Sequence, residues 1–151
     1  MRIAVGSDER TDLTDTVIEE LKKRGYEVAL FGALAGEGLE WAEVGLKVAE
    51  AVAKGGCDEG ILFCWTGTGV CIAANKVPGI RAALCVDAET ARGARRWNHA
   101  NVLVMSLRLT SIPVAREILD AWFSTPYGQE EFDLRNVRRL AEIERRYHSG
   151  A

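Results

Sequence analysis

The segment Gly60–Cys85, GILFCWTGTGVCIAANKVPGIRAALC, contains the features that decide the fold of this chain. Its apolar run Ile61–Phe63 ends in a cysteine, Cys64, and a glycine-rich turn at Thr66–Gly69 leads into a helix-like stretch. In α/β proteins, a strand that ends at a reactive side chain, followed by a glycine turn and a helix N-terminus, forms an anion-binding active site. The segment therefore predicts a site for a small charged substrate beside the Cys64 thiol.

Short apolar runs alternate with amphipathic segments along the chain. The apolar runs predict strands at Arg2–Gly6, Glu27–Phe31, Gly60–Cys64, Ala82–Val86 and Val102–Ser106. The amphipathic segments predict helices at Asp12–Arg24, Glu40–Lys54, Gly69–Lys76, Ala88–Arg96, Ile112–Phe123 and Asp133–Tyr147. Asp12 and Asp87 are expected to cap helix N-termini, and Gly25 to end a helix. Continuous apolar strands separated by helices are typical of a parallel sheet covered on both faces, so we expect an α/β fold.

Length and composition indicate one domain over residues 1–151, because a chain of 151 residues with 48% hydrophobic content can bury one core. The net charge of −3 does not favour nucleic acid or an anionic membrane surface as a partner. No apolar run approaches the roughly 20 residues of a membrane span, and the N-terminus resembles a strand rather than a signal peptide. We therefore expect a cytoplasmic protein, whose charged C-terminal helix near residues 131–148 packs on a partner subunit.

The polar residues that follow the strands are expected to share one rim of the sheet. In an open parallel sheet the ligand site lies outside the carboxyl ends of the strands. This rule predicts that four segments lie together at that rim, namely Gly6–Glu9, Cys64–Thr66, Asp87 and Leu107–Arg108. Trp97 and Asn98, which end a helix, are expected near the same rim.

The four cysteines do not resemble a disulfide framework or a zinc site, because none shows C-x-x-C spacing. The positive end of a helix dipole favours a thiolate at Cys64, which could then act as a nucleophile or a general base. The alternative is a buried, inert cysteine, a common fate of this residue. Cys57, Cys71 and Cys85 are interpreted as structural. A redox pair of Cys64 and Cys71 is disfavoured, since two helical turns separate residues by about 10 Å.

The turn Thr66–Gly69 lacks the marks of a nucleotide site, because Ile72 stands where G-x-G-x-x-G has its third glycine. It is suited to a substrate hydroxyl, a carbonyl oxygen or a small anion, or else it is only a tight strand-to-helix turn. Asp8 and Glu9 end the first strand, where paired carboxylates could do acid–base work or could be capping and solvated charges. These patterns therefore support nucleotide binding only weakly.

The long motif that begins at Cys64 carries a family resemblance. Cys64-x-Thr66-Gly67-x-Gly69, followed by IAANKVPGIRA at residues 72–82, closely resembles the type B ribose-5-phosphate isomerase family, which includes the galactose-6-phosphate isomerase subunits. The resemblance spans nearly the whole chain and takes in Gly6-x-Asp8, Asn98-x-x-Asn101-Val102-Leu103, Arg108, Asp120-Ala121-Trp122 and the basic C-terminal segment.

Membership of this family implies a Rossmann-like three-layer αβα sandwich with a five-stranded parallel sheet. It implies a homodimer, often paired into a tetramer, with active sites between subunits. It also implies interconversion of an aldose phosphate and a ketose phosphate without a metal or another cofactor.

The resemblance further implies a role for several residues. Cys64 moves a proton between C1 and C2 of the sugar through a cis-enediolate. Thr66 and the turn amides around Gly67 and Gly69 stabilise the developing oxyanion, and Asp8 is associated with ring opening. The phosphate is assigned to arginines, namely Arg108, Arg135 and Arg139.

Three positions depart from the family pattern. Glu9 and Trp97 stand where the ribose-phosphate enzymes have histidines, and Trp65 replaces a glycine. A glutamate repels a phosphate dianion unless it is protonated or paired, and the two indoles would reshape the pocket or stack on a sugar. These changes favour a substrate other than ribose 5-phosphate, such as a shorter open-chain sugar phosphate or a different or unphosphorylated sugar. The alternative function is a catalytically weak sugar or sugar-phosphate binding protein on the same fold.

Overall fold

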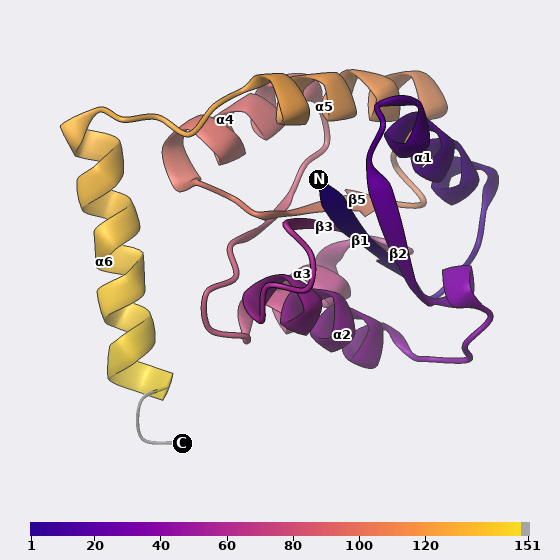
Figure 1. Cartoon of the computed structure of the whole chain (residues 1–151), viewed down its shortest axis with the longest axis horizontal. Helices are drawn as coiled ribbons and strands as arrows, with labels where there is room; N and C mark the ends of the chain where they lie inside the picture. The colour runs from indigo at the N-terminus through magenta and orange to yellow at the C-terminus, as the bar shows by residue number, and fades with distance from the viewer. Residues whose placement is uncertain (149–151) are drawn as a thin grey trace.

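Five parallel strands form the centre of the molecule in the computed structural model, which describes residues 1–148 (Figure 1). Their order across the sheet is β2-β1-β3-β5-β4, and every neighbouring pair is parallel. The strands are β1 Arg2–Ser7, β2 Glu27–Gly32, β3 Glu59–Cys64, β4 Ala82–Leu84 and β5 Val102–Ser106. All five strands expected from the sequence are present. β4 is shorter than expected, since it ends at Leu84 and the chain turns at Asp87 into the next helix.

Helices cover both faces of the sheet, which confirms the expected three-layer αβα sandwich (Figure 1). One face carries α1, α4 and α5, and the other carries α2 and α3. The helices are α1 Asp12–Lys23, α2 Trp41–Ala53, α3 Thr68–Asn75, α4 Ala88–Asn98, α5 Ile112–Ser124 and α6 Glu131–His148, with a 3-10 turn η1 at Ala33–Ala35.

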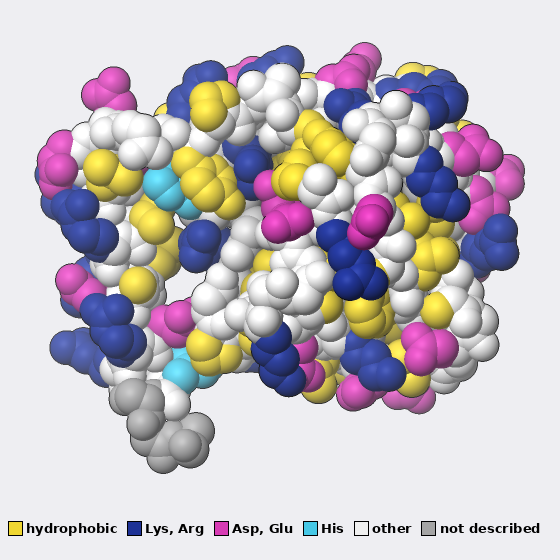
Figure 2. Space-filling view, viewed as in Figure 1, with side chains coloured by type: hydrophobic (Ala, Val, Ile, Leu, Met, Phe, Trp, Pro, Cys, Tyr) yellow, Lys and Arg dark blue, Asp and Glu magenta, His cyan; other side chains and the backbone are white. Residues whose placement is uncertain are grey.

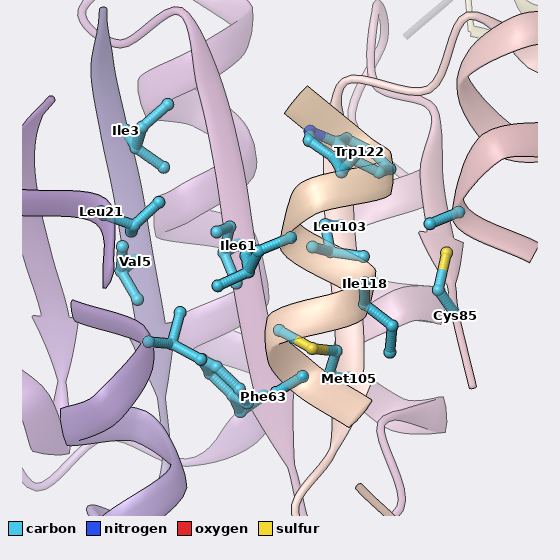
Figure 3. Close-up of a cluster of buried hydrophobic side chains, with 14 of the residues drawn as sticks. Ile3, Val5, Leu21, Ile61, Phe63, Cys85, Leu103, Met105, Ile118 and Trp122 are labelled. Carbon is cyan, nitrogen blue, oxygen red and sulfur yellow. The ribbon is translucent and has the colours of Figure 1, made fainter. Parts of the chain in front are cut away.

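The alternation of side chains along each strand divides the core between the two faces. Ile61 and Phe63 of β3 join the cluster under α1, α4 and α5, whereas Leu62 and Cys64 join the cluster under α2 and α3. Figure 3 shows Phe63, Ile61, Leu103 and Met105 of the sheet facing Ile118 and Trp122 of α5. Burial of each such side chain contributes about 1.5–3 kcal/mol, so the sheet position of Cys64 is firmly fixed.

Local capping explains where the helices that flank the rim begin. Thr11, and not Asp12, caps α1, because the Thr11 side chain accepts from the Thr14 amide while the Thr14 hydroxyl accepts from the Thr11 amide. The expectation for Asp12 was therefore wrong, and Asp12 is the first helical residue. Asp87 caps α4 as expected, and Gly25 follows α1 with a φ of +82°.

The last helix, α6, stands apart from the sandwich (Figure 1). Within the chain it packs mainly on α4, and the Glu144 carboxylate accepts from the Gly79 amide at 3.0 Å. A groove of about 530 Å³ separates α6 from the body and appears as a hollow in Figure 2. Apolar side chains on α6 remain exposed, namely Phe132, Leu140, Ile143 and Tyr147. In the described part of the chain, neither α6 nor any other helix is long and apolar enough to cross a membrane.

Candidate active site

The carboxyl edge of the sheet brings Asp8, Cys64 and Arg108 together. Ser7 pairs with Phe63, and Cys64 pairs with Ser106, so Asp8 continues β1 beside Cys64 at the end of β3. The Cys64 carbonyl accepts from the Leu107 amide at 3.0 Å, and the Trp65 carbonyl accepts from the Arg108 amide at 2.9 Å. The expected gathering of these segments at one rim is therefore present in the structure.

Cys64 lies at the point where a buried strand reaches the surface. All six residues of β3 are buried, and the Cys64 side chain is 5% exposed on the face covered by α2 and α3. The next two residues, Trp65 and Thr66, are exposed. The thiol is thus held by the core on one side while the chain around it opens to solvent, an arrangement that suits a base acting on a bound substrate.

The glycine turn is held in one conformation. Gly67 has a φ of +80°, and a Cβ there would lie 2.7 Å from Leu84 Cδ1 and 3.3 Å from the Met105 carbonyl carbon. Glycine is strongly favoured at this position, because an L side chain is strained at that φ and the Leu84 side chain would have to shift to admit a Cβ. Since α3 begins at the next residue, the amides of its first turn lack helical carbonyl partners. These amides and the helix dipole can stabilise a negative charge beside Cys64.

Hydroxyl groups order the chain around the turn. The Thr66 and Thr68 side-chain oxygens are 2.7 Å apart and share a hydrogen bond. The Ser106 hydroxyl donates to the Trp65 carbonyl at 3.0 Å and accepts from the Leu109 amide at 3.1 Å. Ser106 thereby ties the chain after β3 to the chain after β5, a contact that sequence reasoning missed.

Trp41 is a second residue that the sequence analysis did not single out. It begins α2, and its indole lies over Gly69, where an added Cβ would come within 2.8–3.1 Å of three ring atoms. The indole is 47% exposed. Trp41 therefore forms an aromatic wall beside the helix amides, and the only sequence signal was a tryptophan at the start of an amphipathic helix.

The carboxylates after β1 differ in exposure. Asp8 is half-buried, whereas Glu9 is exposed. The Ser7 hydroxyl accepts from the Glu9 amide at 3.1 Å and donates to the Glu9 carbonyl, which fixes the backbone at the end of β1. Among residues 1–148 no ion pair joins Glu9 to an arginine of the same chain. The exposed Glu9 carboxylate is therefore not paired with a basic side chain in this part of the chain.

The other cysteines have environments that keep them protonated. Burial raises the pKa of the Cys85 thiol to about 12, and burial also raises the pKa values of Cys57 and Cys71. All four cysteines are free thiols. Because the nucleophilic form of a cysteine is the thiolate, Cys57, Cys71 and Cys85 are poor candidates for chemistry near neutral pH.

Trp97 and Asn98 lie at the opposite edge of the sheet. In a parallel β–α–β connection the helix runs back against the strands, so α4 ends beside the beginning of β5. Asn98 accordingly lines the groove along α6, and Trp97 is 52% exposed with its ring over Gly93. The expectation that these two residues share the rim with Cys64 was wrong for a single chain.

Arg135 and Arg139 also lie far from Cys64 in the fold, on α6. Both side chains are exposed. The Arg135 guanidinium stacks on Phe132 at 5.5 Å, and Arg139 pairs with Glu142 at 2.9 Å. A single chain therefore does not bring these arginines to the thiol.

Two asparagines of the family pattern, Asn75 in the long motif and Asn101 before β5, hold the backbone. The Asn75 side-chain amide donates to the Ala82 carbonyl at 2.9 Å and accepts from the Ala82 amide at 2.8 Å. Asn101 accepts from the Arg81 amide at 2.8 Å and donates to the Gly79 carbonyl at 3.0 Å. Both contacts fix the connection between α3 and β4, which explains why these amides stand in the motif without touching the rim. Within residues 1–148, no three His, Cys, Asp or Glu side chains are grouped as metal ligands would be.

The fold and the rim together define a Rossmann-like α/β protein that presents a thiol at the N-terminus of a helix. The chain belongs to the ribose/galactose isomerase family, whose profile matches residues 3–143. This assignment confirms the resemblance found in the motif that begins at Cys64.

Relatives and solved structures agree with the family. The chain is 37% identical to D-erythrulose-4-phosphate isomerase of Pectobacterium atrosepticum over 84% of this chain and 85% of the relative. It is 37% identical to ribose-5-phosphate isomerase B of Escherichia coli over 89% of each chain. The structure of ribose-5-phosphate isomerase B from Clostridium thermocellum superposes with a TM-score of 0.91 at 44% identity, covering 97% of this chain and 99% of the other. The chain is thus an isomerase of the aldose–ketose type, as the motif predicted.

Proposed function

We propose that this protein interconverts an aldose phosphate and a ketose phosphate, with Cys64 as the base and without a cofactor. The observation that carries the proposal is the position of the Cys64 thiol beside the Gly67 turn and the first amides of α3. Isomerisation through an enediolate needs a base next to preorganised donors for the oxyanion, and this rim provides both.

The reaction follows from that geometry. The Cys64 thiolate takes the proton from C2 of the open-chain aldose, and the electron pair moves to the C1 oxygen. Thr66 and the amides around Gly67 and Gly69 stabilise the resulting enediolate oxygen. The Cys64 thiol then returns the proton to C1 while the proton of the C2 hydroxyl moves to the C1 oxygen, so that the carbonyl now stands at C2. Asp8, beside Cys64, is the group proposed to open a cyclic substrate.

A second copy of the chain is proposed to complete the site, as a homodimer or a pair of such dimers. The rim with Cys64 and Arg108 lacks the groups found at the opposite edge, where Asn98 and α6 border one groove. A partner rim inserted into this groove would meet Asn98 and would cover the exposed apolar residues Leu140, Ile143 and Tyr147. Trp97, Arg135 and Arg139 are exposed outside the lining of the groove, and they are proposed to reach the same partner from there. Arginine suits the phosphate because its guanidinium donates two parallel hydrogen bonds.

The substrate is proposed to be shorter than ribose 5-phosphate or to differ from it in its ring. The exposed Glu9 carboxylate adds negative charge to the rim, and the exposed Trp65 and the Trp41 wall occupy space around the turn. A four-carbon sugar phosphate cannot form a furanose ring through its phosphorylated oxygen and needs no ring-opening histidine. The erythrulose-phosphate relative named above is consistent with that size.

Proton NMR in D2O tests this function. The wild-type protein is incubated with four-, five- and six-carbon aldoses, both free and phosphorylated. Formation of the ketose with deuterium entering at the carbon next to the carbonyl is the expected result, with the four-carbon phosphate as the best substrate. A folded protein that exchanges no proton in any of these sugars would contradict the proposal and favour the alternative, a sugar-phosphate binding protein that has lost turnover.

A further inference from the structure

The segment that joins α5 to α6, residues 125–130, has no regular secondary structure, and it is the covalent link between the sandwich and α6. Its contacts with the end of α4 help to set the direction of α6, together with the packing of α6 on α4 and the hydrogen bond from the Gly79 amide to Glu144. Three side chains make these contacts, and none of them lies at the Cys64 rim. We define this group, Arg95, His99 and Tyr127, as the α6 clamp.

Tyr127 is the centre of the α6 clamp. Its ring stacks on the His99 imidazole, with centroids 4.4 Å apart and an interplanar angle of 4°. The Arg95 guanidinium lies 4.4 Å from the same ring. The Tyr127 hydroxyl donates to the Ala100 carbonyl at 3.1 Å and accepts from Arg95 at 3.2 Å. Tyr127 therefore fastens the connecting segment to the end of α4 through both stacking and hydrogen bonds.

Arg95 links the clamp to the hydrophobic core. It forms an ion pair with Glu59 at 3.1 Å, and both side chains are about nine-tenths buried. The Trp122 indole donates to the same Glu59 carboxylate at 2.7 Å, and the Arg95 guanidinium lies 4.9 Å from the Trp122 ring. The ion pair, the hydrogen bond from Arg95 to the Ala100 carbonyl at 2.7 Å and the two aromatic rings hold Arg95 in one position, although its buried Nε has no hydrogen-bond partner among the described residues.

His99 closes the clamp from the other side. It is 8% exposed and adopts a φ of +50°, a conformation that non-glycine residues rarely take. Its Nε2 lies 2.8 Å from the Gly128 carbonyl oxygen, and the Gly128 amide donates to the Arg96 carbonyl at 2.8 Å. The His99 carbonyl accepts from the Arg81 guanidinium at 2.7 Å. The end of α4 and the connecting segment are thus joined at several points as one unit.

We propose that Arg95, His99 and Tyr127 are positioning residues for phosphate binding, because they hold α6 and the end of α4 at a fixed separation. This inference rests on the proposed function, in which Arg135 and Arg139 of one copy serve the site of another. The clamp touches neither the thiol nor the turn. Disrupting the α6 clamp should therefore weaken binding of the substrate's phosphate group without changing the proton transfer at Cys64.

The test compares Tyr127→Ala with Tyr127→Phe. Tyr127→Ala removes the stack and the hydroxyl, whereas Tyr127→Phe keeps the stack and serves as the matched control. For Tyr127→Ala we expect KM for the phosphorylated substrate, and the inhibition constant of inorganic phosphate, to rise about tenfold while kcat stays within about threefold. Tyr127→Phe should have a KM and a phosphate inhibition constant close to those of the wild type. Hydrogen exchange of residues 131–148 should become at least about tenfold faster in Tyr127→Ala, with the strands unchanged.

The outcomes separate this inference from the proposed function. Unchanged exchange of α6 together with an unchanged KM in Tyr127→Ala would overturn the clamp. If Tyr127→Ala lowers kcat and also speeds hydrogen exchange in the strands, the clamp is overturned as well. That result would mean that Tyr127 stabilises the whole core and does not position α6. If the wild-type protein isomerises no sugar, the proposed function fails, and faster exchange of α6 with a weaker inorganic-phosphate affinity in Tyr127→Ala would still support the clamp.

Discussion

The two edges of the sheet differ in what they present, and we propose that they are complementary halves of a site. The carboxyl edge presents the Cys64 thiol and the amides after Gly67, in a turn that neighbouring strands hold rigidly. The opposite edge presents Asn98 along a groove that the chain itself does not fill, and Arg135 and Arg139 are exposed on α6 outside the lining of that groove. In the proposed function the first edge moves the proton, and the second, with the arginines of α6, holds the phosphate. Parallel topology keeps them apart in one chain, which is why we propose that catalysis takes place between copies.

The largest effect on activity is expected from removing the Cys64 thiol at the carboxyl edge. Cys64→Ala is expected to lower kcat about 10²- to 10⁴-fold, because the base that moves the proton is lost. Deuterium incorporation into the best substrate measures the effect. Cys71→Ala is the matched control, since the Cys71 thiol is kept protonated by burial and should be dispensable. Full activity of Cys64→Ala would refute the role of this edge as the catalytic half.

Mixing two inactive variants should test whether the two edges meet across copies. One variant carries Cys64→Ala, and the other carries Arg135→Ala with Arg139→Ala. After the subunits exchange at equal concentrations, half of the dimers contain one intact site, so about a quarter of the wild-type activity should return. Separate samples of each variant provide the baseline. No recovery in a mixture shown to contain heterodimers would mean that each site is built from one chain.

Two glycines with the same backbone conformation allow the edges to be compared directly. Gly67 at the rim and Gly25 after α1 have φ values of +80° and +82°. An added Cβ meets Leu84 and Met105 at Gly67 but nothing within 4 Å at Gly25. Gly67→Ala should therefore lower the free energy of unfolding by about 1–3 kcal/mol more than Gly25→Ala does. Urea unfolding measures both values, and equal losses would show that the turn has room to adjust.

The smallest effect is expected from Cys85, the buried thiol after β4. Its pKa is raised to about 12 in the folded protein from an ordinary value of 9.0, so the folded state holds this proton more tightly than the unfolded chain. The resulting stability is complete below about pH 9 and is lost as the pH rises toward 12, at up to about 1.4 kcal/mol per pH unit.

Cys85→Ala should remove that alkaline decline and leave only a constant cost for the missing sulfur. Unfolding in urea at several values between about pH 8 and about pH 10.5 compares the two proteins, and other groups that titrate there cancel in the difference. Identical slopes for the variant and the wild type would show that the Cys85 thiol ionises normally.

Much of the fold could be read from the sequence because local patterns and burial agree. The five apolar runs and the glycine turn after Cys64 gave the strands and the rim. The position of Trp97 was misjudged because a helix that follows a strand returns to the other edge, a consequence of topology rather than of local pattern. Thr11 was missed as the cap because Asp12 beside it is also a preferred N-cap residue, and only the hydrogen bonds between Thr11 and Thr14 distinguish the two positions.

Contacts between distant segments were the least predictable part of the site. Trp41 meets Gly69 only because α2 and α3 pack side by side. Likewise, Glu59 reads as an ordinary charged residue before an apolar run, yet it is buried against Arg95 and Trp122. Such contacts depend on how the helices and strands are arranged in space, so the spacing of residues along the chain does not predict them.

The placement of the tryptophans provides the molecule with optical reporters that need no label. Trp122 is completely buried with its indole bonded to Glu59, so its emission should be shifted to the blue and should follow unfolding of the core. Trp41, Trp65 and Trp97 are 47–60% exposed and should emit further to the red. Acrylamide should therefore quench the fluorescence of these three exposed tryptophans before that of Trp122. Ligand capture at the rim and melting of the interior can therefore be followed in the same cuvette at two wavelengths.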